Sequence, residues 1–224
     1  MKRSITAVAV GAALALGGCV TTKPMALSRD AQQLELAQES IALMTMRVSN
    51  TYKTGYQPRL KFVRIRSDEG ERATTSYQVG ELLSRDESES SQFEEAVFSF
   101  ALPPGRYQVR EVTVRSESIL TPGWGTVPIF TRFEVKPAQV VYLGRVEAVR
   151  RERKDDGEMR AGPVIPLIDQ AVTGYSGGTF EIRIRDAYES DLKLLRAAYP
   201  ALQKVQVSKA VLPDWRKPSD ADME

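Results

Sequence analysis

The chain has 224 residues, with 31 lysines and arginines, 29 aspartates and glutamates, one cysteine and no histidine. Without histidine, Ser-His-Asp and Cys-His nucleophile systems are excluded, as are ordinary zinc and copper sites. The near balance of charge offers no overall electrostatic reason to bind nucleic acid. We therefore expect no metal, no cofactor and no nucleic-acid partner.

The first eighteen residues have the layout of an export signal. Lys2 and Arg3 provide a positive start, and an apolar stretch over 5–16 follows that is too short to span a bilayer. The stretch ends in Leu16-Gly-Gly-Cys19, which resembles the lipobox of bacterial lipoproteins. The resemblance implies that residues 1–18 are a signal peptide, that cleavage precedes Cys19, and that Cys19 is lipidated.

This processing changes how the composition is interpreted. The chain without residues 1–18 has 29 basic and 29 acidic residues. Lipidation of Cys19 would consume the only thiol, and its acyl chains would anchor the protein in a membrane without help from charge. Val20 stands where aspartate favours inner-membrane retention in Gram-negative sorting, so we expect an outer-membrane anchor and a domain that faces the periplasm.

After the signal, residues 19–29 are polar and show no sustained periodicity, so they are expected to form a tether. Asp30 is placed to cap a short N-terminal helix that extends through Glu39. A strand is expected from about Ile41 to Val48. The folded domain is expected to span 30–211.

Alternating apolar residues and turn signals then recur along the chain. The clearest segments are 59–67, 75–82, 96–100, 106–114, 130–135, 140–144 and 180–185. Phe98 and Phe100 are expected on one face of their strand, and the alternation slips by one residue at Glu111, which predicts a bulge. Eight or nine short strands are typical of a mainly β chain, here a single antiparallel β-sandwich of the immunoglobulin or transthyretin kind.

One C-terminal amphipathic helix interrupts this pattern. Its apolar residues recur at helical spacing, and Asp186 with Glu189 predicts a capping box. The apolar stripe is expected to pack on the edge or bottom of the sandwich: Tyr188, Leu192, Leu195 and Tyr199. A last strand is expected over 205–211, followed by a polar tail over 212–224 that Trp215 anchors to the domain.

Three phrases look familiar as a set: Leu102-Pro-Pro-Gly-Arg-Tyr107, Phe133-Glu-Val-Lys-Pro137 with Val141-Tyr-Leu-Gly144, and Asp186-Ala-Tyr-Glu-Ser-Asp-Leu192 with Tyr199-Pro200. They resemble uncharacterised proteobacterial lipoproteins with a transthyretin-like or carboxypeptidase-regulatory-like β-sandwich domain. The resemblance covers roughly residues 40–211 and implies no catalytic residue.

Two segments rich in glycine and proline are the candidate contact surface. In the first, over 121–128, Gly123 and Gly125 flank Trp124, whose indole is placed to stack on a sugar or to anchor a partner protein. The alternative, favoured because large aromatics are mostly buried, is a tryptophan that folds back over the mouth of the sandwich. The second segment, 151–178, is long for a loop in a compact domain, and such loops are usually functional or disordered.

Charged groups provide two further candidates. A basic patch is formed by Arg150, Arg151, Arg153 and Lys154, which could meet anionic lipids or an acidic partner, although interleaved acids favour a solvated strand end. The carboxylate pairs Glu94-Glu95 and Asp155-Asp156 allow glycoside hydrolysis in principle, but solvated surface is the favoured interpretation.

These observations favour a lipid-anchored envelope protein that is not an enzyme. It would act as a binding or assembly module for a protein partner. One alternative is a module that binds peptidoglycan or another envelope glycan, with Trp124 as the stacking platform. A second alternative is a carboxylate-dependent hydrolase.

Overall fold

A computed structural model describes residues 21–36, 38–69, 73–80, 82–86, 92–119, 122–164 and 172–223. The signal peptide and the lipidation predicted at Cys19 lie outside the described residues. The described part is mainly β, as predicted. Its strands are β1 (Thr21–Lys23), β2 (Ser40–Asn50), β3 (Arg59–Ser67), β4 (Thr74–Gln78), β5 (Leu82–Asp86), β6 (Phe93–Leu102), β7 (Gly105–Ser116), β8 (Gly123–Val135), β9 (Val140–Glu152), β10 (Gly178–Arg185) and β11 (Val207–Lys209).

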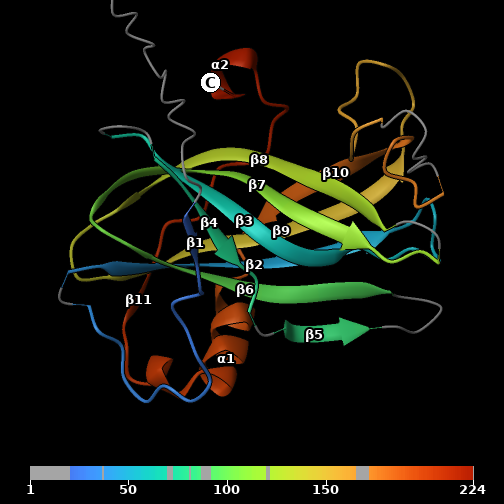
Figure 1. Cartoon of the computed structure of the whole chain (residues 1–224). Coiled ribbons are helices and arrows are strands. Elements are labelled where there is room, and N and C mark those ends of the chain that lie inside the picture. Colours follow the sequence, from blue (N-terminus) through green and yellow to red (C-terminus); the bar gives the residue numbers. More distant parts are fainter. Residues whose placement is uncertain are drawn as a thin grey trace, which may run out of the picture.

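The strands form two sheets that pack as a sandwich (Figure 1). One sheet has the order β1-β4-β3-β7-β8, and the other has the order β10-β9-β2-β6-β5, with β11 also paired to β9. Both sheets are mixed rather than antiparallel, because β2 and β11 run parallel to β9 and β1 runs parallel to β4. These parallel partners lie more than 50 residues apart in the chain, so no hairpin turn in the sequence signals the pairing.

The core lies between the sheets and is built by alternation along the strands. Phe98 and Phe100 are both fully buried on the same face of β6, as predicted, and Tyr77 packs edge-on against Phe100 at a centroid distance of 5.1 Å. The bulge predicted at Glu111 is also present, since the pairing of β7 with β8 shifts between Val109 and Glu111.

Helix α1 (Tyr188–Ala198) covers the outer face of the six-stranded sheet, rather than an edge or the bottom of the sandwich (Figure 1). Leu192 and Leu195 are buried there with residues of β2 and β9, and Pro200 begins a short 3-10 turn, η1 (Pro200–Leu202). The predicted capping box does not form: Ala187 is the cap, while the Asp186 carboxylate accepts the Tyr188 N–H at 3.1 Å.

A buried carboxylate joins α1 to the sheet. Asp191 is fully buried and accepts hydrogen bonds from Thr45, from Tyr142 at 2.5 Å, and from Arg145. Burial and then the Asp191 carboxylate raise the pKa of the Tyr142 hydroxyl. The helix is therefore held by a charged contact as well as by its apolar stripe.

The N-terminal segment departs from the prediction in two ways. No helix forms in the described part of 30–39, and the expected tether is partly folded onto the domain. Residues of β1 pair with β4, and the backbone N–H of Leu27 donates to the Ser99 hydroxyl at 2.9 Å. Leu27 is buried against the sheet, and this apolar contact favours docking over a free, solvated chain.

The C-terminal residues also follow the domain rather than extending as a free polar tail. Leu212 is buried, and the indole N–H of Trp215 donates to the Pro128 carbonyl at 2.7 Å, which confirms the predicted anchor. The short helix α2 (Asp220–Met223) lies beyond it (Figure 1). Among the described residues, no helix is both long enough and apolar enough to span a bilayer.

Candidate functional site

Four connections gather at one end of the sandwich, which we call the loop end. Their described residues are 51–58, 92, 117–119, 122, 153–164 and 172–177. The strand register places them together, since Asn50 pairs with Arg150 in one sheet and Arg59 pairs with Arg115 in the other. Figure 1 shows this end on the right of the molecule, away from α1 and α2. Both predicted contact segments therefore meet at the loop end.

Trp124 does not sit in a display loop, because β8 already begins at Gly123. The indole lies on the outer face of this strand, 41% exposed, so the alternative of a tryptophan folded over the sandwich mouth is also wrong. Arg115 on the paired strand places its guanidinium carbon 5.4 Å from the centroid of the indole. Trp124 thus presents a fixed, partly exposed aromatic surface beside a cation.

Gly123 and Gly125 face the interior, on the opposite side of β8 from Trp124. A Cβ atom built on Gly123 would lie 2.6 Å from the ring of Tyr175, and one on Gly125 would lie 2.7 Å from the Ala161 carbonyl oxygen. The glycines therefore give room for Tyr175 and for the 153–177 connection to approach the strand. Their contacts are with this chain rather than with a partner.

Arg150 is not part of a surface patch. It is fully buried and alternates inward on β9, with its guanidinium carbon 3.9 Å from the centroid of Tyr175. One nitrogen donates to the Tyr56 carbonyl at 2.6 Å, whereas Nε and Nη1 have no hydrogen-bond partner. Burial lowers the pKa of this guanidinium. Strand alternation, rather than proximity in sequence, places Arg150 inside the sandwich and its neighbour Arg151 outside.

Arg150 and Tyr175 belong to a polar network that holds two of these connections against strands β2, β7 and β9. The Ser116 hydroxyl donates to the Tyr56 carbonyl at 3.0 Å and lies 2.9 Å from the Tyr175 hydroxyl. Asn50 also donates to the Tyr56 carbonyl, at 3.0 Å. Sequence reasoning missed both tyrosines. The available signal was Tyr175 itself, an aromatic within the glycine-rich run 174–178.

The remaining basic residues are matched by acids from the same connection. Arg151 pairs with Glu158 at 2.5 Å, and Arg153 pairs with Asp156 at 3.3 Å. The backbone N–H of Lys154 also donates to Glu158, at 2.8 Å. These hydrogen bonds, from Arg151 first, lower the pKa of Glu158 to about 2. Much of the predicted patch is therefore neutralised locally.

Glu94 and Glu95 are buried rather than solvated, and they point to opposite faces of β6. Glu94 accepts the Leu60 N–H at 2.7 Å and so links the two sheets. Glu95 instead meets Arg47 at 3.2 Å on the outer face of the six-stranded sheet. The two carboxylates therefore do not flank a shared site, which a glycosidase pair requires.

Exposed apolar side chains concentrate at the loop end. Among the described residues, six large hydrophobic side chains are exposed, and four belong to this end: Ile119, Trp124, Val164 and Val172. Val164 follows Gly162, where a Cβ atom would lie 2.5 Å from the Trp124 carbonyl oxygen. Val172 precedes Thr173, whose side chain closes on Gly123. The connections thus bring these apolar groups to the same end as Trp124.

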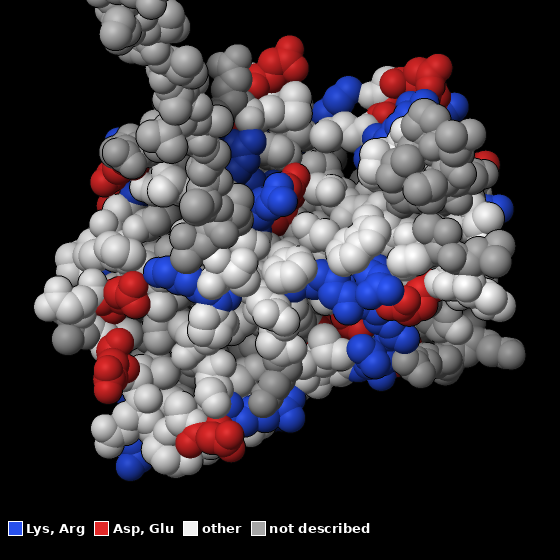
Figure 2. Space-filling model, viewed as in Figure 1, with Lys and Arg blue, Asp and Glu red and all other residues white. Residues whose placement is uncertain are grey.

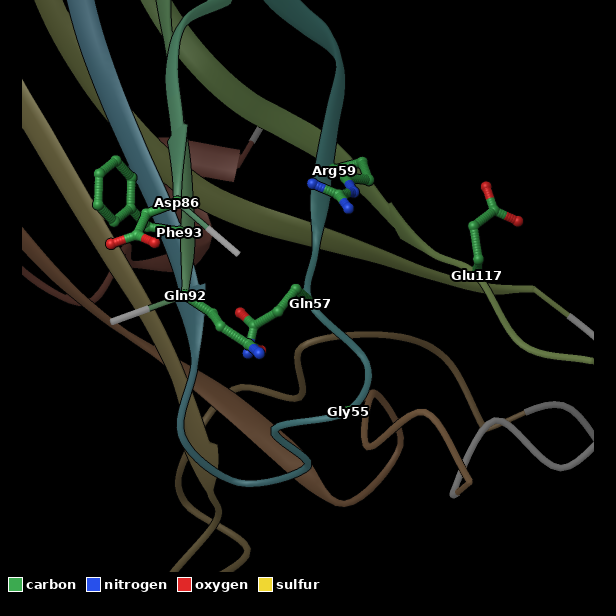
Figure 3. A pocket seen from close by; sticks show the side chains of 7 residues that line it. All are labelled: Gly55, Gln57, Arg59, Asp86, Gln92, Phe93 and Glu117. Atoms are coloured by element: carbon green, nitrogen blue, oxygen red, sulfur yellow. The ribbon is translucent and has the colours of Figure 1, made fainter. Parts of the chain in front are cut away.

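A polar hollow of about 310 Å³ opens at the loop end, between the two sheets (Figure 3). Its lining carries two amides, three charged groups and one aromatic ring: Gly55, Gln57, Arg59, Asp86, Gln92, Phe93 and Glu117. Such a mixture of amides, carboxylates and an arginine beside a ring can hydrogen-bond a polar ligand rich in hydroxyl groups. The aromatic ring of this lining, Phe93, already makes a cation–π contact, since the Arg47 guanidinium carbon lies 4.2 Å from its centroid.

The fold and this end of the molecule define a mainly β sandwich with an exposed apolar and aromatic surface beside a polar hollow. No protein-family model matches the sequence, and no curated protein or solved structure matches the chain. No group of three or more histidine, cysteine, aspartate or glutamate side chains is placed to hold a metal ion within the described part.

Proposed function

We propose that the chain is a lipid-anchored, outer-membrane protein of the cell envelope that acts without catalysis, as a binding or assembly module for a protein partner. The observation that carries the proposal is the gathering of Ile119, Trp124, Val164 and Val172 at the loop end. Exposed apolar groups that gather in one region favour an interaction site, and aromatic and arginine side chains are enriched at the energetic centres of interfaces.

The geometry around Trp124 suits a contact surface. The indole is held on a strand rather than on a flexible loop, and Arg115 stands beside it. A side chain fixed in this way loses little conformational entropy when a partner binds. The buried network of Arg150, Tyr175 and Ser116 holds the neighbouring connections in place from the interior of the sandwich.

A photo-crosslinking residue at position 124, irradiated in intact cells, tests the proposal. We expect a discrete protein adduct. The same residue at position 194 is the matched control, since Leu194 is comparably exposed, at 47%, but lies on α1, far from the loop end. Equal adducts at both positions, or none at 124 in a correctly anchored protein, would contradict the assignment.

The membrane anchor has its own test. Replacing the predicted acceptor, Cys19→Ser, should block acylation and leave the unprocessed precursor in the cell. Metabolic labelling with a fatty acid and the change in mass on cleavage provide the measurement. Normal processing of the C19S chain would refute lipidation while leaving the partner-binding proposal intact.

A second candidate function, binding of an envelope glycan, is favoured by the polar hollow of Figure 3. Its amides and carboxylates suit sugar hydroxyls, and Gln57→Ala or Gln92→Ala should then weaken retention of the domain on peptidoglycan. Trp124→Ala would weaken retention as well if the indole extends the glycan site. Unchanged retention in all three variants would remove this candidate.

A further inference from the structure

A row of polar side chains crosses the outer face of the five-stranded sheet. Arg66 of β3 pairs with Gln108 of β7, and Gln108 pairs with Arg132 of β8. Residues directly opposite one another in a sheet project from the same face. Figure 2 shows Lys and Arg side chains, with acidic ones among them, in several groups on the visible surface.

Beside the row lies a depression of about 530 Å³, which we call the arginine hollow. Its lining comes from three strands and from α2: Arg66, Asp68, Arg106, Arg132, Phe133, Glu134 and Ala221. Asp68 offsets part of the positive charge, since it pairs with Arg132 at 3.0 Å. Arg66 is 5% exposed, lies 3.8 Å from Asp68, and its buried Nε has no hydrogen-bond partner. The hollow is therefore lined by a guanidinium that Asp68 pairs only loosely.

The C-terminal residues contact this face as a peptide ligand would. Gln108 donates to the Asp222 carbonyl at 3.2 Å, and Arg110 donates to the Met223 carbonyl. The Asp222 carboxylate lies 3.5 Å from Arg132 and 3.0 Å from Arg216. The strands therefore recognise backbone carbonyls and a carboxylate together.

The local sequence prepares this segment for the contact. The Ser219 backbone N–H and hydroxyl both donate to the Asp222 carboxylate, at 2.9 and 2.7 Å, so Asp222 makes one of the two contacts of a capping box. These bonds, followed by Arg216, lower the pKa of Asp222. Burial and the neighbouring Arg66 lower the pKa of Arg110, as expected where cations crowd.

We propose that the polar row and the arginine hollow beside it together bind an acidic peptide segment of a partner protein, and that Ser219–Met223 is the intramolecular occupant of the part of this site formed by the row. Donors to two successive peptide carbonyls favour a peptide over a lipid head group, which offers no such carbonyls. The hollow lies toward the opposite end of β8 from Trp124, eight residues away or roughly 25 Å at the usual strand rise. The inference is therefore independent of the loop end.

The full-length chain tests this with a synthetic peptide of residues 219–224 as the probe, carrying a fluorophore for anisotropy. Asp222→Lys places a cation among Arg110, Arg132 and Arg216 and should displace the native tail. We expect at least tenfold tighter peptide binding to D222K than to the native chain, because a tethered occupant competes at millimolar effective concentration. A second substitution in the D222K chain, Arg132→Gln, should weaken peptide binding, and a higher salt concentration should weaken it as well.

Two controls match these changes. Asp214→Lys makes the same charge change at an exposed tail position away from the hollow and should leave binding at the native level. A peptide with both aspartates changed to asparagine should bind more weakly. Absence of peptide binding to a folded D222K chain overturns the proposal. A peptide affinity that stays the same when R132Q is added to D222K overturns it too. Binding of D222K to vesicles of anionic lipid, without peptide binding, overturns it in favour of a membrane contact.

A further measurement does not depend on the folding of D222K. In the native chain, excess peptide should displace the tail and speed trypsin cleavage after Arg216. An unchanged cleavage rate at saturating peptide would count against an exchangeable tail.

Discussion

Tyr175 reaches the interior at the loop end because two glycines leave its path open. Gly123 and Gly125 lie on the inner face of β8, and Tyr175 is fully buried beside them. The glycines and prolines around Trp124 predict a loop at one end of the sandwich, with the indole either displayed or folded back, and neither interpretation assigns the glycines a packing role. A glycine that permits a turn and one that permits close packing look alike in a sequence, and only the position of Tyr175 separates them.

Gly125→Ala should lower the free energy of unfolding by about 1–3 kcal/mol, the usual cost of overpacking a well-filled core. The added methyl group would collide with the Tyr175 ring and the Ala161 carbonyl. Chemical denaturation measures the loss. Gly55→Ala is the matched control, because nothing lies within 4 Å of its added Cβ atom. Equal stability of the two variants would show that Tyr175 does not pack as described.

Arg150 also shows how the choice of strand face determines what a residue does. It was grouped with Arg151 by sequence proximity, yet the two point to opposite sides of β9. The buried guanidinium of Arg150 packs over the Tyr175 ring in the interior, while Arg151 forms an ion pair with Glu158 on the outside of the sheet. The alternation around Val146 to Arg150 was a usable signal that the charge count obscured.

At the scale of elements, helix α1 combines a predictable apolar stripe with a contact that the sequence does not reveal. Leu192 and Leu195 follow from helical periodicity. Asp191 lies outside the predicted stripe, and its partners Thr45 and Arg145 are 146 and 46 residues away in the chain. Distant charge partners leave no local pattern.

Asp191→Ala should cost about 3–5 kcal/mol of unfolding free energy, because it leaves Arg145 mostly buried without this carboxylate. Glu189→Ala, on the exposed side of the same helix, is the control and should change stability by no more than roughly 0.5 kcal/mol. Thermal unfolding followed by circular dichroism provides the comparison. A small effect of D191A would mean that the apolar stripe alone holds the helix.

The connection over 153–162 should be sensitive to acid through Glu158. Its pKa in the folded chain is about 2, below the usual 4.5, so its stabilising contact is fully present above pH 4.5. The contact is lost as the pH falls from about 4.5 to about 2. The melting temperature of the native chain should therefore exceed that of Glu158→Gln most above pH 5, and the difference should shrink on acidification. A difference that is constant over this range would contradict the assigned role of Glu158.

For the whole molecule, alternation predicted the mainly β class and most strands, including the phenylalanine face of β6. The arrangement of strands was less accessible. The parallel contact of β2 with β9 joins segments about a hundred residues apart, such as Ile41 and Val140. Likewise, Glu94 and Glu95 were expected to be solvated, since the arginine and backbone partners that satisfy them come from other strands.

Thr21 is already fixed beside Thr75, at the end of the five-stranded sheet away from Arg59. Under the proposed lipidation, only Val20 lies between Cys19 and this paired position, a span of about 7 Å. The sandwich would then lie directly at the membrane surface instead of being joined to it by a flexible linker. It would hold Trp124 outward, at a height set by the length of the strands, so a partner would have to meet the protein at that fixed distance from the membrane.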